Sequence, residues 1–202
     1  LVVRVGIPTS EDCLHLNVFT RQGLVDLAEQ SDVAIQDQGR SLAPVLVFIH
    51  GGGFNLGSAR HPFISPPPRR LSQRLGAVYV TIQYRLAALG NLYHQSLVDE
   101  GDDVGPGVFN LLDQNAALKW IKANARVFGG DPNNIVIMGE SAGAFSICFH
   151  LVSPMSRGLF SRAIMQSAVC DFAFPSISEA EAQGETFLKS LGCPTSPTVD
   201  AN

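Results

Sequence analysis

The stretch that decides the fold is NIVIMGESAGAFSICFHLV, residues 134–152. It opens with an apolar, β-branched run, passes through the five residues GESAG, and continues as an apolar stretch of helical length. This order predicts a buried strand at 134–139, then a sharp turn, then a helix that starts at Ser141 and ends near Val152, before a Ser-Pro pair.

The turn in this stretch places a serine at its apex. A sharp strand-to-helix turn brings the two backbones close together, so the positions two before and two after the apex must be small, and they are Gly139 and Gly143. The start of a helix also favours developing negative charge. The pattern therefore predicts Ser141 as a nucleophile. The alternative is that Ser141 is a helix N-cap and the glycines serve only the turn.

A second glycine-rich segment, FIHGGGFNLG at residues 48–57, follows an apolar run. Attack on an ester carbonyl creates an oxyanion, which backbone N–H groups must stabilise. Glycines allow such a loop to turn its N–H groups inward, since no Cβ stands in the way. We expect the donors to be Gly52, Gly53 and Ala142, the residue after the serine. The alternative is that the glycines form only a flexible turn.

The rest of the chain predicts an α/β fold with a mostly parallel sheet. Alternation between strands and helices is typical of parallel sheets. Continuous apolar runs predict buried strands at 45–50 and 77–84 and a weaker one at 162–167, whereas 14–19 alternates and predicts a half-exposed strand near a sheet edge.

A long helix is predicted to begin at Asn110, its expected N-cap, with Asp113 placed near the positive end of the helix dipole. Its apolar face carries residues at helical spacing, and a Gly-Gly pair supplies the stop. These face residues are Ala117, Ile121, Ala125 and Phe128, followed by Gly129 and Gly130.

Two segments are predicted to be loops. Residues 21–43 are polar and hold at most one weak helical turn, around Val25 to Ala28. Residues 57–70 end in SPPPRR, whose prolines argue against a regular helix or a central strand.

Composition narrows the classes of function. The chain has 202 residues, 46% of them hydrophobic, and a formal net charge of −4. This charge gives no reason to expect a nucleic-acid partner, and no apolar run reaches the roughly 18 residues of a membrane span. The four cysteines lack C-x-x-C spacing, so zinc binding through them is not expected. Cys148 falls in an apolar helical run and is interpreted as a core residue, whereas Cys13 and Cys193 lie in polar surroundings as candidate disulfide halves.

Four segments together resemble type-B carboxylesterases, the cholinesterase-like branch of the α/β-hydrolase fold. They are SEDCLHLNVFTR at 10–21, HGGGF at 50–54, QYRLAALG at 83–90, and the helix and elbow at 111–151. The resemblance implies a serine hydrolase of small carboxylic esters that needs no cofactor or metal. It implies Ser141 as nucleophile and Gly52, Gly53 and Ala142 as the oxyanion hole. It also implies that Cys13 and Cys193 pair with cysteines outside this chain, and it favours secretion or the endoplasmic reticulum lumen.

A serine nucleophile works in a catalytic triad with a histidine base and a carboxylic acid. Neither the base nor the acid is found in this sequence. In this fold they follow the serine, yet the only later histidine is His150, about 13 Å along the same helix. We therefore expect His150 to be packed or partly exposed, and we interpret residues 1–202 as a single partial domain truncated at both ends. Such a piece is expected to be poorly soluble and at best weakly active on its own. The alternative function is a catalytically silent adhesion or binding protein of the same fold.

Overall fold

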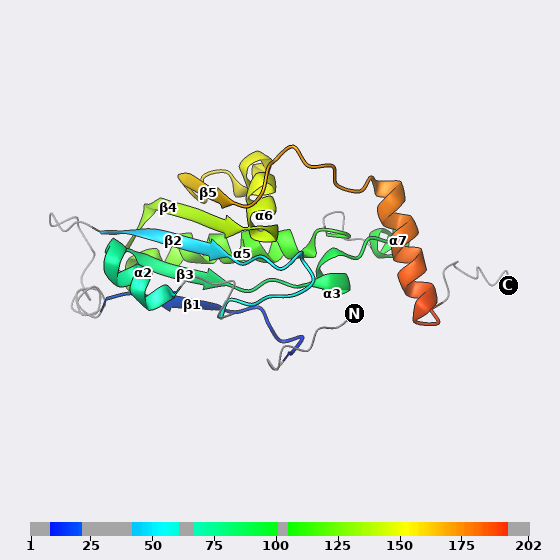
Figure 1. The fold of residues 1–202 in the computed structure, drawn as a ribbon, viewed down its shortest axis with the longest axis horizontal. Coiled ribbons are helices and arrows are strands. Elements are labelled where there is room, and N and C mark those ends of the chain that lie inside the picture. Colours follow the sequence, from blue (N-terminus) through cyan, green and yellow to red (C-terminus); the bar gives the residue numbers. More distant parts are fainter. Residues whose placement is uncertain (1–8, 22–41, 61–66, 101–104, 194–202) are drawn as a thin grey trace.

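The structure is a computed structural model that describes residues 9–21, 42–60, 67–100 and 105–193. A five-stranded sheet with the order β1-β3-β2-β4-β5 forms its centre (Figure 1). Only β1 runs antiparallel to its neighbour, and the other pairings are parallel. The strands are β1 (Leu16–Phe19), β2 (Ala43–Ile49), β3 (Val78–Ile82), β4 (Gly130–Glu140) and β5 (Arg162–Gln166). The sequence predicted all five, including β1 at an edge.

Helices alternate with the parallel strands, which confirms the predicted α/β class. Six α-helices and two short 3-10 helices are described. The α-helices are α2 (Pro68–Leu75), α3 (Ala87–Asn91), α4 (Gln95–Asp99), α5 (Phe109–Asn124), α6 (Ala142–Val152) and α7 (Ile177–Ser190); the 3-10 helices are η1 (Ala125–Phe128) and η2 (Pro154–Ser156). In the described part of the chain, no helix is both long enough and apolar enough to span a bilayer.

The core lies on both faces of the sheet. Successive side chains of a strand point to opposite faces, so Val47 and Ile49 of β2 join the larger cluster, to which Leu118 of α5 and Ile147 of α6 also belong. Phe48 joins a smaller cluster on the opposite face, packed against α2. Burial on both faces explains why the central strands are apolar without alternation.

The long helix differs from the prediction at its start. It begins at Phe109 with Val108 at the N-cap position, so Asn110 lies inside the first turn and accepts a hydrogen bond from the N–H of Leu111 at 2.7 Å. The predicted apolar face is confirmed, since its residues are buried in or packed against the core. Gly129, in the left-handed conformation at φ 77°, ends η1 as expected, while Gly130 already belongs to β4.

The proline-rich segment was only partly interpreted correctly. The prolines predict no regular helix within 57–70, yet α2 begins at Pro68. Proline is tolerated in the first turn of a helix, where its missing N–H would have no acceptor. The helical turn predicted around residues 25–28 lies outside the described residues.

Candidate active site

The sheet register brings the two glycine-containing segments to the same edge. Strands β2 and β4 are parallel neighbours in which Ile49 pairs with Gly139. Gly51 and Ser141 each lie two residues beyond this pair, at the carboxyl ends of their strands. Ligands of open α/β sheets bind in crevices outside this edge.

Ser141 has the strained backbone of an elbow. Its φ of 52° and ψ of −119° lie in a region that residues with a Cβ rarely adopt. Its N–H donates to the carbonyl of Gln166 on β5, and its carbonyl accepts from the N–H groups of Ala144 and Phe145 in α6. The serine is therefore fixed from the strand side and from the helix side, and its side chain does not act as an N-cap.

The flanking glycines are required by close approach of backbones. A Cβ on Gly139 would lie 2.4 Å from the carbonyl carbon of Gly143. A Cβ on Gly143 would lie 2.0 Å from the carbonyl oxygen of Ile49, at the end of β2. Any side chain at either position would push α6 away from the sheet. The spacing of the GESAG motif is thus explained by packing as well as by chemistry.

The glycine-rich loop lies directly against the serine. A Cβ on Gly51 would come within 3.1 Å of the Cβ of Ser141 and within 2.7 Å of the carbonyl oxygen of Glu140. Gly52 has a φ of 113°, and its carbonyl accepts hydrogen bonds from the N–H groups of Asn55 and Leu56, which folds the loop into a turn. The structure therefore brings the two predicted segments together.

Three amide groups of the elbow and the glycine-rich loop have no acceptor within the described backbone. Ala142 is the first residue of α6, so its N–H has no partner inside the helix. Among the described residues, the N–H groups of Gly52 and Gly53 likewise donate to no backbone carbonyl. These are the groups that the sequence predicted as oxyanion donors.

His50 supports the glycine-rich loop from beneath. Its buried imidazole stacks on the ring of Tyr84, with the ring centroids 4.3 Å apart, and its Nδ1 lies 2.8 Å from the carbonyl oxygen of Gly51. The Tyr84 hydroxyl donates to the carbonyl of His50 at 2.6 Å. Gly57 leaves room for the imidazole, because a Cβ there would lie 2.6 Å from His50 Nδ1.

His150 belongs to a buried polar network between α5 and α6. Its Nε2 lies 3.0 Å from the side-chain oxygen of Gln114, and its Nδ1 lies 2.9 Å from the hydroxyl of Ser156. Gln114 also donates to Ser146, whose hydroxyl donates to the carbonyl of Ala142 in the elbow. Burial lowers the pKa of His150 to about 4. His150 is therefore neutral and packed, and its hydrogen bonds help to hold α6 in place. The sequence led us to expect no catalytic role for it.

Asp113 has a different role from the one predicted. It lies just beyond the first turn of α5 and forms a bidentate ion pair with Arg85, with nitrogen–oxygen distances of 2.8 Å. The same carboxylate accepts the N–H of Arg85 at 3.0 Å, and the guanidinium lies over the ring of Phe109. This pair fastens the segment after β3 to α5. Sequence reasoning missed it because the two residues are distant in the chain.

The interpretation of Cys148 as a free core residue was wrong. Cys148 of α6 forms a disulfide with Cys170, in the segment that follows β5. Three phenylalanines pack together beside this link, Phe145 with Phe172 and Phe174 at centroid distances of 4.9 and 5.8 Å. The disulfide therefore ties the segment after β5 to the helix that carries the elbow. Cys13 and Cys193 are both free within the described chain.

The mostly parallel sheet, its flanking helices and the strand–elbow–helix at Ser141 define an α/β-hydrolase fold. Solved structures agree: a carboxylesterase of Geobacillus stearothermophilus is similar with a TM-score of 0.75 and 35% identity, over 95% of this chain and 36% of that one. A thermophilic pNB esterase is similar with a TM-score of 0.73 and 34% identity, over 96% of this chain and 36% of that one. The chain belongs to the carboxylesterase family, whose model matches residues 3–202.

Curated relatives extend the comparison. Esterase FE4 of Myzus persicae is 43% identical over 94% of this chain and 30% of its own length. Acetylcholinesterase of Leptinotarsa decemlineata is 38% identical over 91% of this chain and 29% of its own length. The chain thus spans about 30% of the length of these relatives.

Proposed function

We propose that this chain carries the nucleophile and the oxyanion hole of a serine carboxylic-ester hydrolase. The observation that carries the proposal is the placement of Ser141, on a strained elbow, directly against the glycine-rich loop. Strain at a defined backbone position is typical of functional sites, and here it supports a serine fixed at the carboxyl edge of the sheet. Membership of a family of ester hydrolases supports the same chemistry.

The proposed reaction has two steps. The Oγ of Ser141 attacks the ester carbonyl carbon and passes its proton to a general base. The oxyanion that forms accepts hydrogen bonds from the N–H groups of Gly52, Gly53 and Ala142, and it collapses with release of the alcohol and formation of an acyl-serine. The base returns its proton to the leaving alcohol. Water then attacks the acyl-serine as the base takes its proton, the carboxylic acid is released, and that proton returns to the Oγ of Ser141. Loss of one oxyanion donor typically lowers kcat by about 10²–10³-fold.

The base and the acid of the triad are proposed to lie outside these 202 residues. His150 is held by Gln114 and Ser156, and His50 is stacked beneath the loop, so each already has a structural role. We therefore expect the 202 residues alone to have residual activity at most. Without the other triad members, only the oxyanion hole and substrate binding contribute to catalysis. The site is proposed to act on small carboxylic esters.

The experiment is fluorophosphonate labelling of the protein from its native source, with the labelled peptide and the intact mass read by mass spectrometry. We expect the label on Ser141. The recombinant Ser141→Ala variant of the same protein should lose it, and the Ser178→Ala variant should retain it, because Ser178 is exposed on α7.

One result would decide against the hydrolase, and another would decide against Ser141 as its nucleophile. A folded protein that takes no label on Ser141, and that hydrolyses no carboxylic ester, would show that the elbow is not activated. A catalytically silent adhesion or binding protein of the same fold would then replace the present proposal. Label on a different serine would show that the nucleophile is misassigned.

A further inference from the structure

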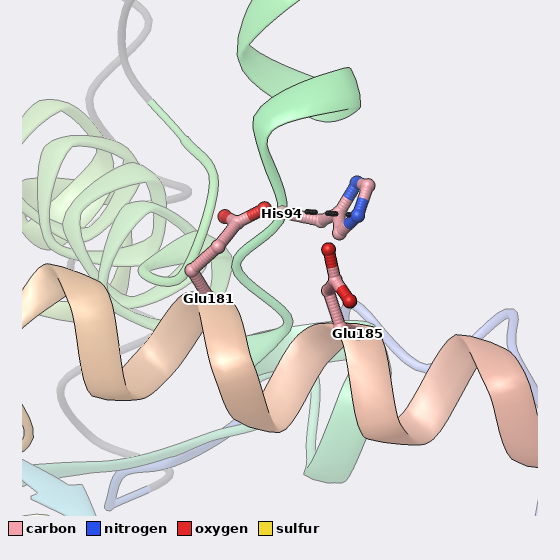
Figure 2. A group of neighbouring side chains, drawn as sticks. All are labelled: His94, Glu181 and Glu185. Atoms are coloured by element: carbon pink, nitrogen blue, oxygen red, sulfur yellow. Dashed lines mark ion pairs between the residues drawn. The ribbon is translucent and has the colours of Figure 1, made fainter. Parts of the chain in front are cut away.

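Three side chains with metal-ligating groups meet where α7 contacts the rest of the protein (Figure 2). His94 lies just before α4, and Glu181 and Glu185 lie one turn apart on α7. One ligand atom from each residue falls within 4.8 Å of the other two. None of the three belongs to the elbow or to the glycine-rich loop.

The contact that forms this cluster is close. A Cβ on Gly184 would lie 2.0 Å from the carbonyl oxygen of Tyr93, so only glycine allows α7 to approach the 92–95 segment at this point. The N–H of Gln95 donates to Oε1 of Glu181 at 3.2 Å. Residues four apart on a helix share one face, so both glutamates point toward His94 from this contact.

His94 is oriented toward the carboxylates. Its side chain is only 9% exposed, and its Nδ1 lies 2.7 Å from the hydroxyl of Ser96. The other nitrogen, Nε2, lies 3.7 Å from Oε1 of Glu181, which is too long for a hydrogen bond. This distance of 3.7 Å is close to the separation of two ligand atoms that each lie about 2 Å from one zinc ion.

One carboxylate oxygen in the cluster is buried without a donor. Oε2 of Glu181 is inaccessible to solvent and accepts no hydrogen bond from any described residue. Glu185 uses its own Oε2 to bind Lys189 at 2.7 Å, which leaves its second oxygen for another partner. Burying part of a carboxylate is unfavourable without a compensating charge, and a cation bound at Oε1, the Glu181 oxygen that faces His94 in Figure 2, would supply that charge.

We propose that His94, Glu181 and Glu185 bind a divalent metal ion of the zinc type that fastens α7 to the 92–95 segment. One imidazole nitrogen with two carboxylates is a ligand set that zinc accepts, and three protein ligands leave the fourth tetrahedral position to water. The metal supplies a positive charge beside the partly buried carboxylate of Glu181, and it joins two segments 87 residues apart.

Ser96 is the supporting residue of this site. Binding through Nε2 requires that the ring proton of His94 reside on Nδ1, where the Ser96 hydroxyl can accept it at 2.7 Å. Metal-bound histidines generally donate their other N–H in this way, and loss of such a partner weakens metal affinity by about 10–100-fold. In this structure Nδ1 accepts the N–H of Ser96 at 3.2 Å, so metal binding through Nε2 must replace that hydrogen bond by one from Nδ1 to the Ser96 hydroxyl.

The test is calorimetric titration of the chelator-treated protein with zinc chloride. We expect one site with submicromolar affinity and a melting temperature that rises with zinc. The His94→Gln, Glu181→Gln and Glu185→Gln variants should each lose more affinity than Ser96→Ala, whose loss should be about 10–100-fold. The matched control is Glu100→Gln, which removes one exposed carboxylate outside the cluster.

The alternative is an ion-pair cluster in which a protonated His94 neutralises the glutamates. It predicts that zinc binds weakly and leaves the melting temperature unchanged. Either of these two results overturns the proposal. Equal zinc affinity in the wild type and in His94→Gln would also overturn it. If the variants fail to fold, X-ray absorption at the zinc edge of the loaded wild type decides: one imidazole with oxygen ligands is expected, and a spectrum without imidazole contradicts the assignment.

Discussion

His150 gives the sharpest test of how the elbow helix is held. Its imidazole is buried between Gln114 and Ser156, and the chain contains no other histidine after the serine. If the residue is structural, the substitution His150→Gln should preserve a donor toward Gln114 and remove the titrating group. If it were a catalytic base, the same change would abolish ester hydrolysis.

The size of the expected change in stability with pH follows from the lowered pKa of His150. Burial lowers the pKa of His150 from an ordinary 6.5 to about 4. Between these values the unfolded chain takes up a proton that the folded chain does not, so stability falls as the pH falls from about 6.5 to about 4. The full difference corresponds to about 3 kcal/mol, and about 2 kcal/mol of it should be lost between pH 7.5 and pH 5.

The assay is urea unfolding of the wild type and of His150→Gln at pH 7.5, 6 and 5, with ester hydrolysis measured at pH 7.5 per folded molecule. Subtracting the two pH profiles removes the contribution of every other group. We expect the wild type to lose about 2 kcal/mol more than the variant over this interval. Parallel profiles would refute the buried neutral imidazole, and a folded variant without hydrolysis would refute the structural role.

Three further predictions concern the same core. Asp113→Asn should lower the free energy of unfolding by about 2–4 kcal/mol in urea titrations, because Arg85 loses its bidentate partner; a change below about 0.5 kcal/mol would contradict this. Ser141→Gly should raise the melting temperature, with a gain of about 1 kcal/mol from the relief of backbone strain, while ending fluorophosphonate labelling; a lower melting temperature would argue against strain. Reducing the Cys148–Cys170 link should lower stability by about 3 kcal/mol, and a Cys148→Ser, Cys170→Ser double variant, which should be insensitive to reductant, is the control.

Local patterns were sufficient to predict the sheet and the elbow. The run at 134–139 is apolar on both faces because β4 lies inside a parallel sheet, and Gly139 and Gly143 are glycines because backbones meet there within 2.0–2.4 Å of any added Cβ. Burial of the strand and close contact of the backbones both constrain residues that are neighbours in the chain, so each is visible as a local pattern in the sequence. The N-cap of α5 was misplaced by two residues, Asn110 in place of Val108, since Asn110 is a favourable N-cap residue that the structure uses inside the first turn.

The features that the sequence did not reveal are pairings across long stretches of chain. Asp113 contacts Arg85 over 28 residues, Cys148 joins Cys170 over 22, and Glu181 approaches His94 over 87. Each partner, taken alone, has an ordinary local explanation: an acid near a helix start, a cysteine in an apolar run, a glutamate on an exposed helix. Only the topology converts them into an ion pair, a disulfide and a candidate metal site. The polar side chains of α5 show the same limit. Gln114 is polar and buried, as are Asn110 and Asn115, and such a mismatch is a local sign that their hydrogen-bond partners lie elsewhere in the chain.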